Sequence, residues 1–307
     1  MKYEIFKELE RMLKGKILYQ VSLKRYTSLR VGGIADIMIY PATIKELQTI
    51  ITFSHRHSIP FCIIGRGTNL LIKDGGIRGI VIKLSRCCNT IKTAEPVRGQ
   101  VRLTAGAGVS LQRLLLFAVN RNLSGLEFLS GIPGSLGGAL AMNAGAHGTE
   151  MKDVTAAVTL LNPHAEIIEQ TPSTLHFGYR HLALPKGTVI LKAVLKMKRS
   201  TKNVLRSRIK KINEWRRRVQ PLNYPNAGSV FKNPSGQSAG QLVEQVGLKG
   251  YTVGNAQVSE KHANFIVNRG GATAKDILTL MDIMHNKVYQ ATGIRLQPEI
   301  CIAGENG

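Results

Sequence analysis

The spacing of apolar and polar positions predicts a mixture of short helices and short strands over the first 200 residues. Residues 2–14 carry apolar side chains at helical spacing and are predicted to form an amphipathic helix. Thr43 and Ser110 each precede apolar residues spaced three and four apart, and both residue types favour the position before a helix. Glu46, three residues after Thr43, completes the pattern of a capping box, and Pro60 ends that helix. The predicted strands, the first entered through a tight turn at 32–33, are 29–40, 61–64, 80–84, 101–105, 154–161, 165–170 and 188–198.

The pattern changes near residue 200, where a second and smaller α+β unit is predicted to begin. A basic helix over 200–219 leads into a long loop that several prolines interrupt. Two further helices are predicted: one over 238–246, opened by a capping box at Ser238, and one over 273–292, opened by Thr273-Ala-Lys-Asp276. The predicted strands of this unit are 253–258, 264–267 and 299–302. With no internal repeat in the sequence, the whole chain is predicted to be α+β.

The composition is that of a globular protein. The chain has 307 residues, 43% of them hydrophobic, which is enough for two or three domains with real cores. No apolar run approaches the roughly 20 residues of a membrane helix. The first 16 residues lack the continuous apolar stretch of a secretion signal, so we expect a cytoplasmic protein without membrane insertion. No cysteine belongs to a C-x-x-C pair, and His55 and His57 do not face each other on a helix, so no metal site is predicted.

A strong positive charge is the unusual feature of the composition. Lys and Arg number 42 against 19 Asp and Glu, giving a formal net charge of +23. Such an excess favours anionic partners. Aromatic residues make up only 6% and the basic residues are spread along the chain, so no specific nucleic-acid partner is predicted. The densest basic run, 205–218, is either a solvated helix face or a helix whose last arginines reach a phosphate.

Three glycine-rich segments suggest chemistry. They are 63–71, 105–108 and 130–146, the first two directly after predicted strands. Glycine lets backbone N–H groups approach phosphate oxygens closely. None of the segments is a P-loop or a dinucleotide fingerprint of the G-x-G-x-x-G type. Singly each is a weak signal, and 105–108 could equally be a structural turn, but together they predict a dinucleotide cofactor.

The sequences of these and later segments resemble a known family. Gly65-Arg-Gly-Thr-Asn69, Gly131-Ile-Pro-Gly-Ser-Leu-Gly-Gly138 and Asn143-Ala-Gly145 resemble the FAD-binding fold of the vanillyl-alcohol-oxidase type. Ala227-Gly-Ser-Val-Phe-Lys-Asn-Pro234, Ser259-Glu-Lys-His-Ala-Asn-Phe-Ile-Val-Asn268 and Leu296-Gln-Pro-Glu-Ile300 narrow the resemblance. Together they are similar to the UDP-N-acetylenolpyruvoylglucosamine reductase (MurB) family of peptidoglycan synthesis, from about residue 27 to residue 302.

The resemblance implies both an architecture and a reaction. Residues 1–90 and 91–200 would be two α+β FAD-binding subdomains, and 201–307 a smaller α+β substrate-binding domain. The implied cofactors are FAD and NADPH. The implied activity is the NADPH- and FAD-dependent reduction of UDP-N-acetylglucosamine enolpyruvate, a small-molecule substrate, to UDP-N-acetylmuramate. We expect the protein to act as a monomer.

The resemblance also implies roles for three catalytic residues. Arg180, in Phe177-Gly-Tyr-Arg180, matches the family's catalytic arginine, whose planar fork suits the substrate carboxylate. Ser229 matches the proton donor. Glu299 matches the catalytic glutamate, which in protonated form could donate a hydrogen bond to that carboxylate.

The binding residues that the resemblance implies fall into two sets. The cofactor-binding residues are Ile64, Gly65, Arg66, Gly67, Thr68, Asn69, Leu70, Gly131, Ile132, Pro133, Gly134, Ser135, Gly138, Asn143, Ala144 and Gly145. The substrate-binding residues are Arg217, Lys232, Asn233, His262 and Asn264, with a structural role for His262 equally open.

The chain also departs from the family pattern. Leu182 occupies a place where a serine often supports the catalytic arginine. The segment from Arg180 to the strand at Thr188 is short and has no tyrosine, which is typical of the shorter branch of the family. Two alternatives stay open: a flavin-dependent sugar or alcohol oxidase of the same fold, and a basic nucleic-acid-binding protein.

Overall fold

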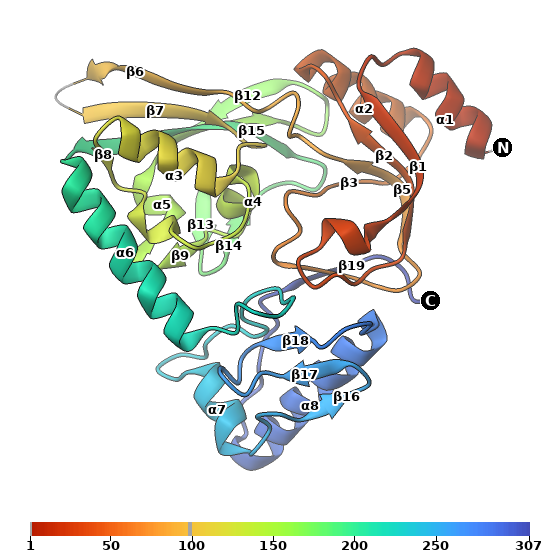
Figure 1. The fold of residues 1–307 in the computed structure, drawn as a ribbon. Coiled ribbons are helices and arrows are strands. Elements are labelled where there is room, and N and C mark those ends of the chain that lie inside the picture. Colours follow the sequence, from red (N-terminus) through yellow and green to blue (C-terminus); the bar gives the residue numbers. More distant parts are fainter. Residues whose placement is uncertain (1, 98–99) are drawn as a thin grey trace. The chain divides into compact units, whose positions relative to one another are not determined.

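The computed structural model describes residues 2–97 and 100–307, which Figure 1 colours along the chain. They divide into two compact units. Unit 1 consists of Met1–Tyr19, Ile37–Arg66 and Gly79–Glu214. Unit 2 consists of Gln20–Asp36, Gly67–Arg78 and Trp215–Gly307. Mixed helices and strands occur in both, so the predicted α+β class is confirmed.

The first layer of unit 1 is a small sheet with two helices. Its strand order is β1-β2-β5-β3, and β3 runs parallel to β5. The bounds are α1 Lys2–Arg11, β1 Lys16–Ser22, β2 Ile34–Tyr40, α2 Ile44–Arg56, β3 Phe61–Ile63 and β5 Ile77–Ile82. Buried residues of α1 and α2, including Leu9 and Ile50, pack in one core with Ile37 of β2 and Ile80 of β5.

The second layer of unit 1 is a larger antiparallel sheet. Its order is β12-β11-β15-β7-β6, and β8 pairs with the end of β15. The strands are β6 Ile91–Val97, β7 Gln100–Gly106, β8 Leu123–Ser124, β11 Thr155–Leu161, β12 Ile167–Gln170 and β15 Val189–Arg199. The helices α3 Leu111–Asn120 and α4 Leu136–Ala141 lie near it, and the long α6, Lys202–Val219, follows β15 (Figure 1). Short elements complete the unit: β9 Gly145–Ala146, β10 Thr149–Glu150, α5 Met151–Val154, β13 His176–Gly178 and β14 His181–Ala183.

Unit 2 packs two helices on a three-stranded sheet. The sheet is β16 Thr252–Val253, β17 Ala256–Val258 and β18 Ile266–Asn268, and the helices are α7 Ala239–Gln245 and α8 Ala274–Thr292. A parallel pair, β4 Leu70–Ile72 with β19 Cys301–Ala303, ties the end of the chain to a segment more than 200 residues earlier. Ile277, Leu280 and Met284 of α8 are buried with Val258 and Ile266 in the core of this unit.

Most predicted elements are confirmed, and the differences have local causes. At Thr43 the hydroxyl accepts from the Glu46 N–H, but the Glu46 carboxylate accepts from Ala42 and Gly15, so the predicted capping box is only half formed. The Ser238 hydroxyl likewise caps α7 by accepting from the N–H of Gln241. The single strand predicted over 253–258 is wrong: the chain turns at Gly254, with φ +53°, and forms the hairpin of β16 and β17. No helix in the part of the chain described here is long and apolar enough to cross a membrane.

Candidate active site

The three glycine-rich segments converge in unit 1. A Cβ built on Gly65 would lie 2.5 Å from the Ser135 Oγ, so the first and third segments meet with no side chain between them. The Gly137 N–H donates to the Ala107 carbonyl at 2.9 Å, which joins the third segment to the second. Gly65 places no side chain at this meeting point. The open backbone fits a pyrophosphate held by N–H groups. The residues present therefore fit FAD.

The glycines of the second segment have a packing role. A Cβ on Gly106 would lie 2.4 Å from the Cys88 carbonyl oxygen, and one on Gly108 would lie 2.3 Å from that of Leu84. The Gly108 N–H also donates to Cys88 at 2.8 Å. Of the two readings left open for 105–108, the geometry supports the structural turn.

The first segment continues into unit 2, where it is hydrogen-bonded to the backbone of Glu299, the predicted catalytic glutamate. Gly67 has φ +64°, and a Cβ there would lie 2.0 Å from the Tyr26 carbonyl oxygen, so only glycine fits. The Asn69 side chain donates to the Glu299 carbonyl at 3.0 Å, and the Asn69 carbonyl accepts from Cys301 at 3.0 Å. Asn69, predicted to bind the cofactor, therefore also fixes the backbone that carries Glu299.

Unit 2 brings Ser229 and Glu299 onto neighbouring segments that lie outside its named strands. The Glu299 N–H donates to the Val230 carbonyl at 2.7 Å, one residue from Ser229. On the other side of that segment, Ser229 forms a bridge pair with Phe265. Both Ser229 and Glu299 are half-buried. A backbone ladder thus holds the predicted proton donor beside the predicted glutamate.

Asn264 is the clamp of this ladder. It is only 3% exposed, and its side chain accepts from the Phe231 N–H at 3.0 Å and donates to the Phe231 carbonyl at 2.8 Å. Its own carbonyl accepts from Val230 at 2.8 Å. The Asn264 amide is therefore engaged with the backbone beside Ser229, which makes it a positioning group.

Two other residues predicted to bind substrate are also held by the protein. Burial lowers the pKa of His262, and its Nδ1 accepts from the Asn264 N–H at 3.2 Å, so the neutral ring carries its proton on Nε2. The ring packs against Phe265 with centroids 4.8 Å apart. The Asn233 side chain accepts from the N–H of Ala239, the first residue of α7, at 3.0 Å.

Arg180 lies in unit 1 at the tip of the β13–β14 hairpin. Its φ is +56°, a left-handed conformation that is uncommon outside glycine and concentrates at functional sites. Its guanidinium lies 5.2 Å from the centroid of the Tyr179 ring. Leu182, where the family pattern often has serine, is 4% exposed in the core of the unit, so it anchors the hairpin by packing alone.

Asn143 supplies the polar support that Leu182 does not. The residue has no exposed surface, and its side chain donates to the Gly178 carbonyl and to Glu150, each at 3.0 Å. Its Oδ1 accepts from the Lys152 N–H at 3.0 Å. Asn143 therefore holds the strand end that precedes Arg180. Sequence spacing could not reveal this, because Gly178 lies 35 residues away.

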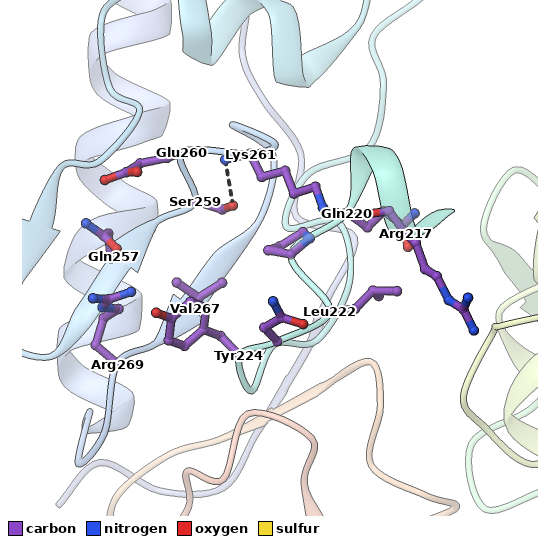
Figure 2. A pocket seen from close by; sticks show the side chains of 12 residues that line it. Arg217, Gln220, Leu222, Tyr224, Gln257, Ser259, Glu260, Lys261, Val267 and Arg269 are labelled. Carbon is purple, nitrogen blue, oxygen red and sulfur yellow. Dashed lines mark hydrogen bonds between the residues drawn. The ribbon is translucent and has the colours of Figure 1, made fainter. Parts of the chain in front are cut away.

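A pocket of about 400 Å³ in unit 2 carries one further predicted residue (Figure 2). Arg217, Lys261 and Arg269 line it together with a single acid, Glu260. Arg269 lies over the Tyr224 ring, 4.5 Å from its centroid. Of these only Arg217 was predicted to bind substrate. The signal that could have identified the others is a basic residue within the 259–268 segment, Lys261, and one directly after it, Arg269.

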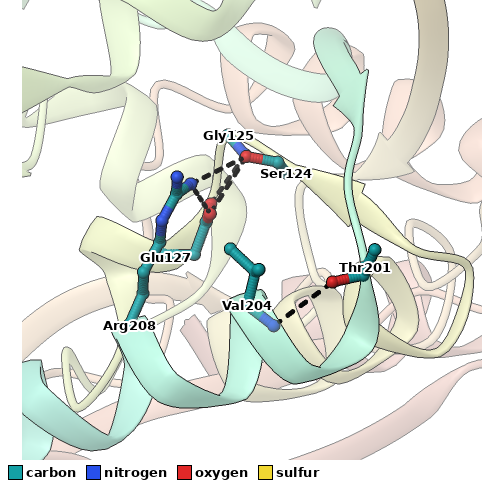
Figure 3. Close-up of polar contacts among 6 residues, drawn as sticks. All are labelled: Ser124, Gly125, Glu127, Thr201, Val204 and Arg208. Atoms are coloured by element: carbon teal, nitrogen blue, oxygen red, sulfur yellow. Dashed lines mark hydrogen bonds and ion pairs between the residues drawn. The ribbon is translucent and has the colours of Figure 1, made fainter.

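The basic helix α6 has a structural face as well. Arg208 pairs with Glu127 at 3.1 Å, as Figure 3 shows, and Glu127 also accepts from the Ser124 hydroxyl and the Gly125 N–H. Burial alone would raise the pKa of Glu127, but these hydrogen bonds outweigh it and hold the pKa below its usual value. Part of the basic run thus compensates a buried carboxylate.

Comparisons with known proteins agree with this arrangement. Residues 35–171 match the model of an FAD binding domain, and residues 220–303 match that of the UDP-N-acetylenolpyruvoylglucosamine reductase C-terminal domain. A UDP-N-acetylenolpyruvoylglucosamine reductase of Syntrophus aciditrophicus is 42% identical over 99% of this chain and 97% of its own. One of Caldanaerobacter subterraneus is 43% identical over 97% of each.

A solved structure shares the fold. The UDP-N-acetylenolpyruvylglucosamine reductase (MurB) of Thermus caldophilus superposes with a TM-score of 0.78 at 35% identity, covering 94% of this chain and 99% of that one. The predicted FAD-binding fold of the vanillyl-alcohol-oxidase type, followed by a second α+β part, is thereby confirmed.

Proposed function

The chain belongs to the UDP-N-acetylenolpyruvoylglucosamine reductase family, and on that basis we propose how its residues share the work of the reaction. The protein is an FAD- and NADPH-dependent oxidoreductase, UDP-N-acetylmuramate dehydrogenase, of peptidoglycan synthesis. It reduces UDP-N-acetylglucosamine enolpyruvate to UDP-N-acetylmuramate. Bound FAD supplies the hydride transfer between NADPH and the enolpyruvyl double bond.

Ser229 protonates the substrate in this proposal. Hydride addition to the methylene carbon places negative charge on the neighbouring carbon, which must then receive a proton. The Ser229 hydroxyl is a weak acid, so its position must be accurate. The ladder through Val230 and Phe265 supports that role, because it fixes the backbone of Ser229 on both sides.

In this proposal, Arg180 and Glu299 stabilise the negative charge on the substrate carboxylate. Arg180 provides a permanent positive charge in a planar fork. Glu299 contributes only while protonated, as a hydrogen-bond donor. The left-handed backbone of Arg180 supports a functional role, since such strain persists where the surrounding structure imposes it.

The cofactor contacts are proposed for the backbone of the first and third glycine-rich segments, 64–70 and 131–138. Their meeting at Gly65 and Ser135 is the observation that supports this. For Asn143 we propose a positioning role through Gly178, because its side chain is saturated by protein groups.

The unit 2 pocket is proposed to take the anionic part of the substrate. Three cationic side chains and one acidic side chain line the pocket, and this excess of positive charge suits a diphosphate. A hydrogen bond from the Lys261 ammonium to the Arg217 carbonyl joins two of these residues. The protein is proposed to work as a cytoplasmic monomer on this small molecule. The domain ranges 1–90, 91–200 and 201–307 remain predictions.

The placement of Ser229 beside Glu299 is the observation that best supports the proposed roles, and the colour of the flavin tests the function. Under anaerobic conditions NADPH should bleach the yellow holoprotein, and UDP-N-acetylglucosamine enolpyruvate should restore the colour. A flavin that NADPH does not bleach, but that a sugar or alcohol does, would point to the oxidase alternative. A colourless protein with steeply salt-dependent DNA binding would point to the nucleic-acid alternative.

A further inference from the structure

We propose that Lys83 is a positioning residue for FAD, acting through the Gly65 peptide to aim the Arg66 N–H at the cofactor pyrophosphate. The inference rests on the proposed role of the 64–70 segment in binding FAD. Lys83 belongs to none of the motifs that the sequence resemblance is built on.

The position of Lys83 follows from the parallel pairing of β3 and β5. Lys83 is the first residue after β5, as Ile64 is after β3. Its own N–H donates to the Ile39 carbonyl at 2.9 Å, and Ile64 donates to the Ile82 carbonyl at 3.0 Å. Lys83 therefore lies beside the loop that follows β3. The ammonium of its half-buried side chain donates to the Gly65 carbonyl in that loop.

The planarity of the peptide makes this contact consequential. In a trans peptide the carbonyl of one residue and the N–H of the next point in opposite directions. No cis peptide occurs in the described residues. With the Gly65 oxygen turned inward to Lys83, the Arg66 N–H must turn outward. The carbonyl that would repel a phosphate is thus held away, and a donor takes its place.

The pKa of the Lys83 ammonium lies well below its ordinary value. Burial, and to a smaller extent the positive charge of Arg66 on the adjoining loop, lower the pKa of the Lys83 ammonium to about 8. The Gly65 carbonyl that accepts from the Lys83 ammonium carries no net charge. A bound pyrophosphate would bring negative charge to this site and raise the pKa again.

Binding of FAD should therefore take up a proton when the pH lies near or above 8. Below that pH, Lys83 is already charged in the apoprotein and no proton is exchanged. Above it, the apoprotein must first be protonated, so the dissociation constant of FAD should rise with pH. A lysine that served only to fill space would give neither effect.

The test measures FAD binding to the full-length apoprotein from pH 7 to 9.5. Calorimetry in two buffers of different ionisation enthalpy counts the protons taken up, and quenching of FAD fluorescence gives the dissociation constant. Wild type should show uptake near pH 8 to 9 and weaker binding at higher pH. Lys83→Met should bind about 10- to 100-fold more weakly at pH 7, without proton uptake, because a charge-assisted hydrogen bond is lost.

Two further variants make the result decisive. Lys83→Arg, which cannot lose its proton in this range, should bind FAD with little pH dependence. Lys45→Met, on an exposed face of α2, is the matched control and should behave as wild type. Wild-type proton uptake in Lys83→Met would overturn the inference. Gly65→Ala separates the two proposals: if it leaves FAD affinity unchanged, the role of the 64–70 segment itself fails.

Discussion

The backbone positions of Arg180 and of the Ser229–Glu299 pair are maintained in different ways. In unit 2, several main-chain hydrogen bonds hold Ser229 and Glu299 between neighbouring segments. In unit 1, Arg180 lies at the tip of a hairpin of two three-residue strands, with a left-handed φ and one buried amide, that of Asn143, behind it. A ladder of main-chain hydrogen bonds should tolerate the loss of one side chain better than a short hairpin whose strand end is held by the Asn143 amide.

The largest loss of activity should come from removing the Ser229 hydroxyl, the proposed proton donor that the ladder of unit 2 holds in place. Ser229→Ala should slow oxidation of the reduced enzyme by the enolpyruvyl substrate by about 10²–10⁴-fold, the usual contribution of general acid catalysis. Reduction by NADPH should be nearly unchanged, because that step protonates no carbon. Ser235→Ala, an exposed serine of the same unit, is the matched control for stopped-flow measurement. Equal loss in both steps would mean a folding defect.

Substitutions at the substrate carboxylate should have the next largest effect. Arg180→Lys keeps the charge but loses the fork, and should slow the substrate step by about 10²–10³-fold. Glu299→Gln keeps a donor of similar shape, so it should retain more single-turnover activity than Glu299→Ala. If Glu299→Ala matches wild type while Glu299→Gln is inactive, Glu299 is not a donor.

The third prediction compares the two buried amides that support the site, Asn143 in unit 1 and Asn264 in unit 2. Asn143→Ala removes the amide behind the hairpin, and Asn264→Ala removes the clamp of the ladder. Each should lower the free energy of unfolding by about 1–3 kcal/mol, since buried backbone groups lose their partners. We expect about a tenfold loss of activity in Asn143→Ala, at the low end of misplacement costs, and a smaller loss in Asn264→Ala. Denaturant unfolding and turnover measured on the same samples check this, and a greater loss in Asn264→Ala would reverse the comparison.

The sequence predicts those elements of the fold whose stabilising contacts lie within a few residues, and it misses those that depend on distant contacts. The N-terminal caps at Thr43, Ser110 and Thr273 were predictable because each side chain bonds within three residues. The β13–β14 hairpin was missed, since two three-residue strands leave no readable alternation.

The same limit applies to the site. Arg180, Ser229 and Glu299 were identified by motif, but nothing in their spacing shows what holds them. Gly178, which Asn143 supports, lies 35 residues from it, and Phe231, which Asn264 supports, lies 33 residues from it. Their amides become interpretable as supports only once tertiary structure brings those segments together.

The smallest effect should come from pH. The pKa of folded His262 lies below its usual value because of burial, so between these two values the unfolded chain binds more protons than the folded one. The contribution of His262 to stability is therefore present above its unfolded pKa and is lost as pH falls. His262→Asn, which keeps an acceptor near the Nδ1 position, should lose less stability than wild type between pH 7 and pH 5.5 in thermal unfolding. An identical loss in both proteins would show that His262 does not titrate there.

The most direct test of the central claim, that Ser229 delivers a proton to the substrate in a step separate from reduction by NADPH, needs only solvent exchange. Both half-reactions of the wild-type holoenzyme would be followed anaerobically in H₂O and D₂O, and the product analysed for deuterium. The account predicts a solvent isotope effect confined to the substrate half-reaction and one deuterium at the carbon beside the carboxylate. Protium at the carbon beside the carboxylate, or an equal isotope effect in both half-reactions, would contradict it.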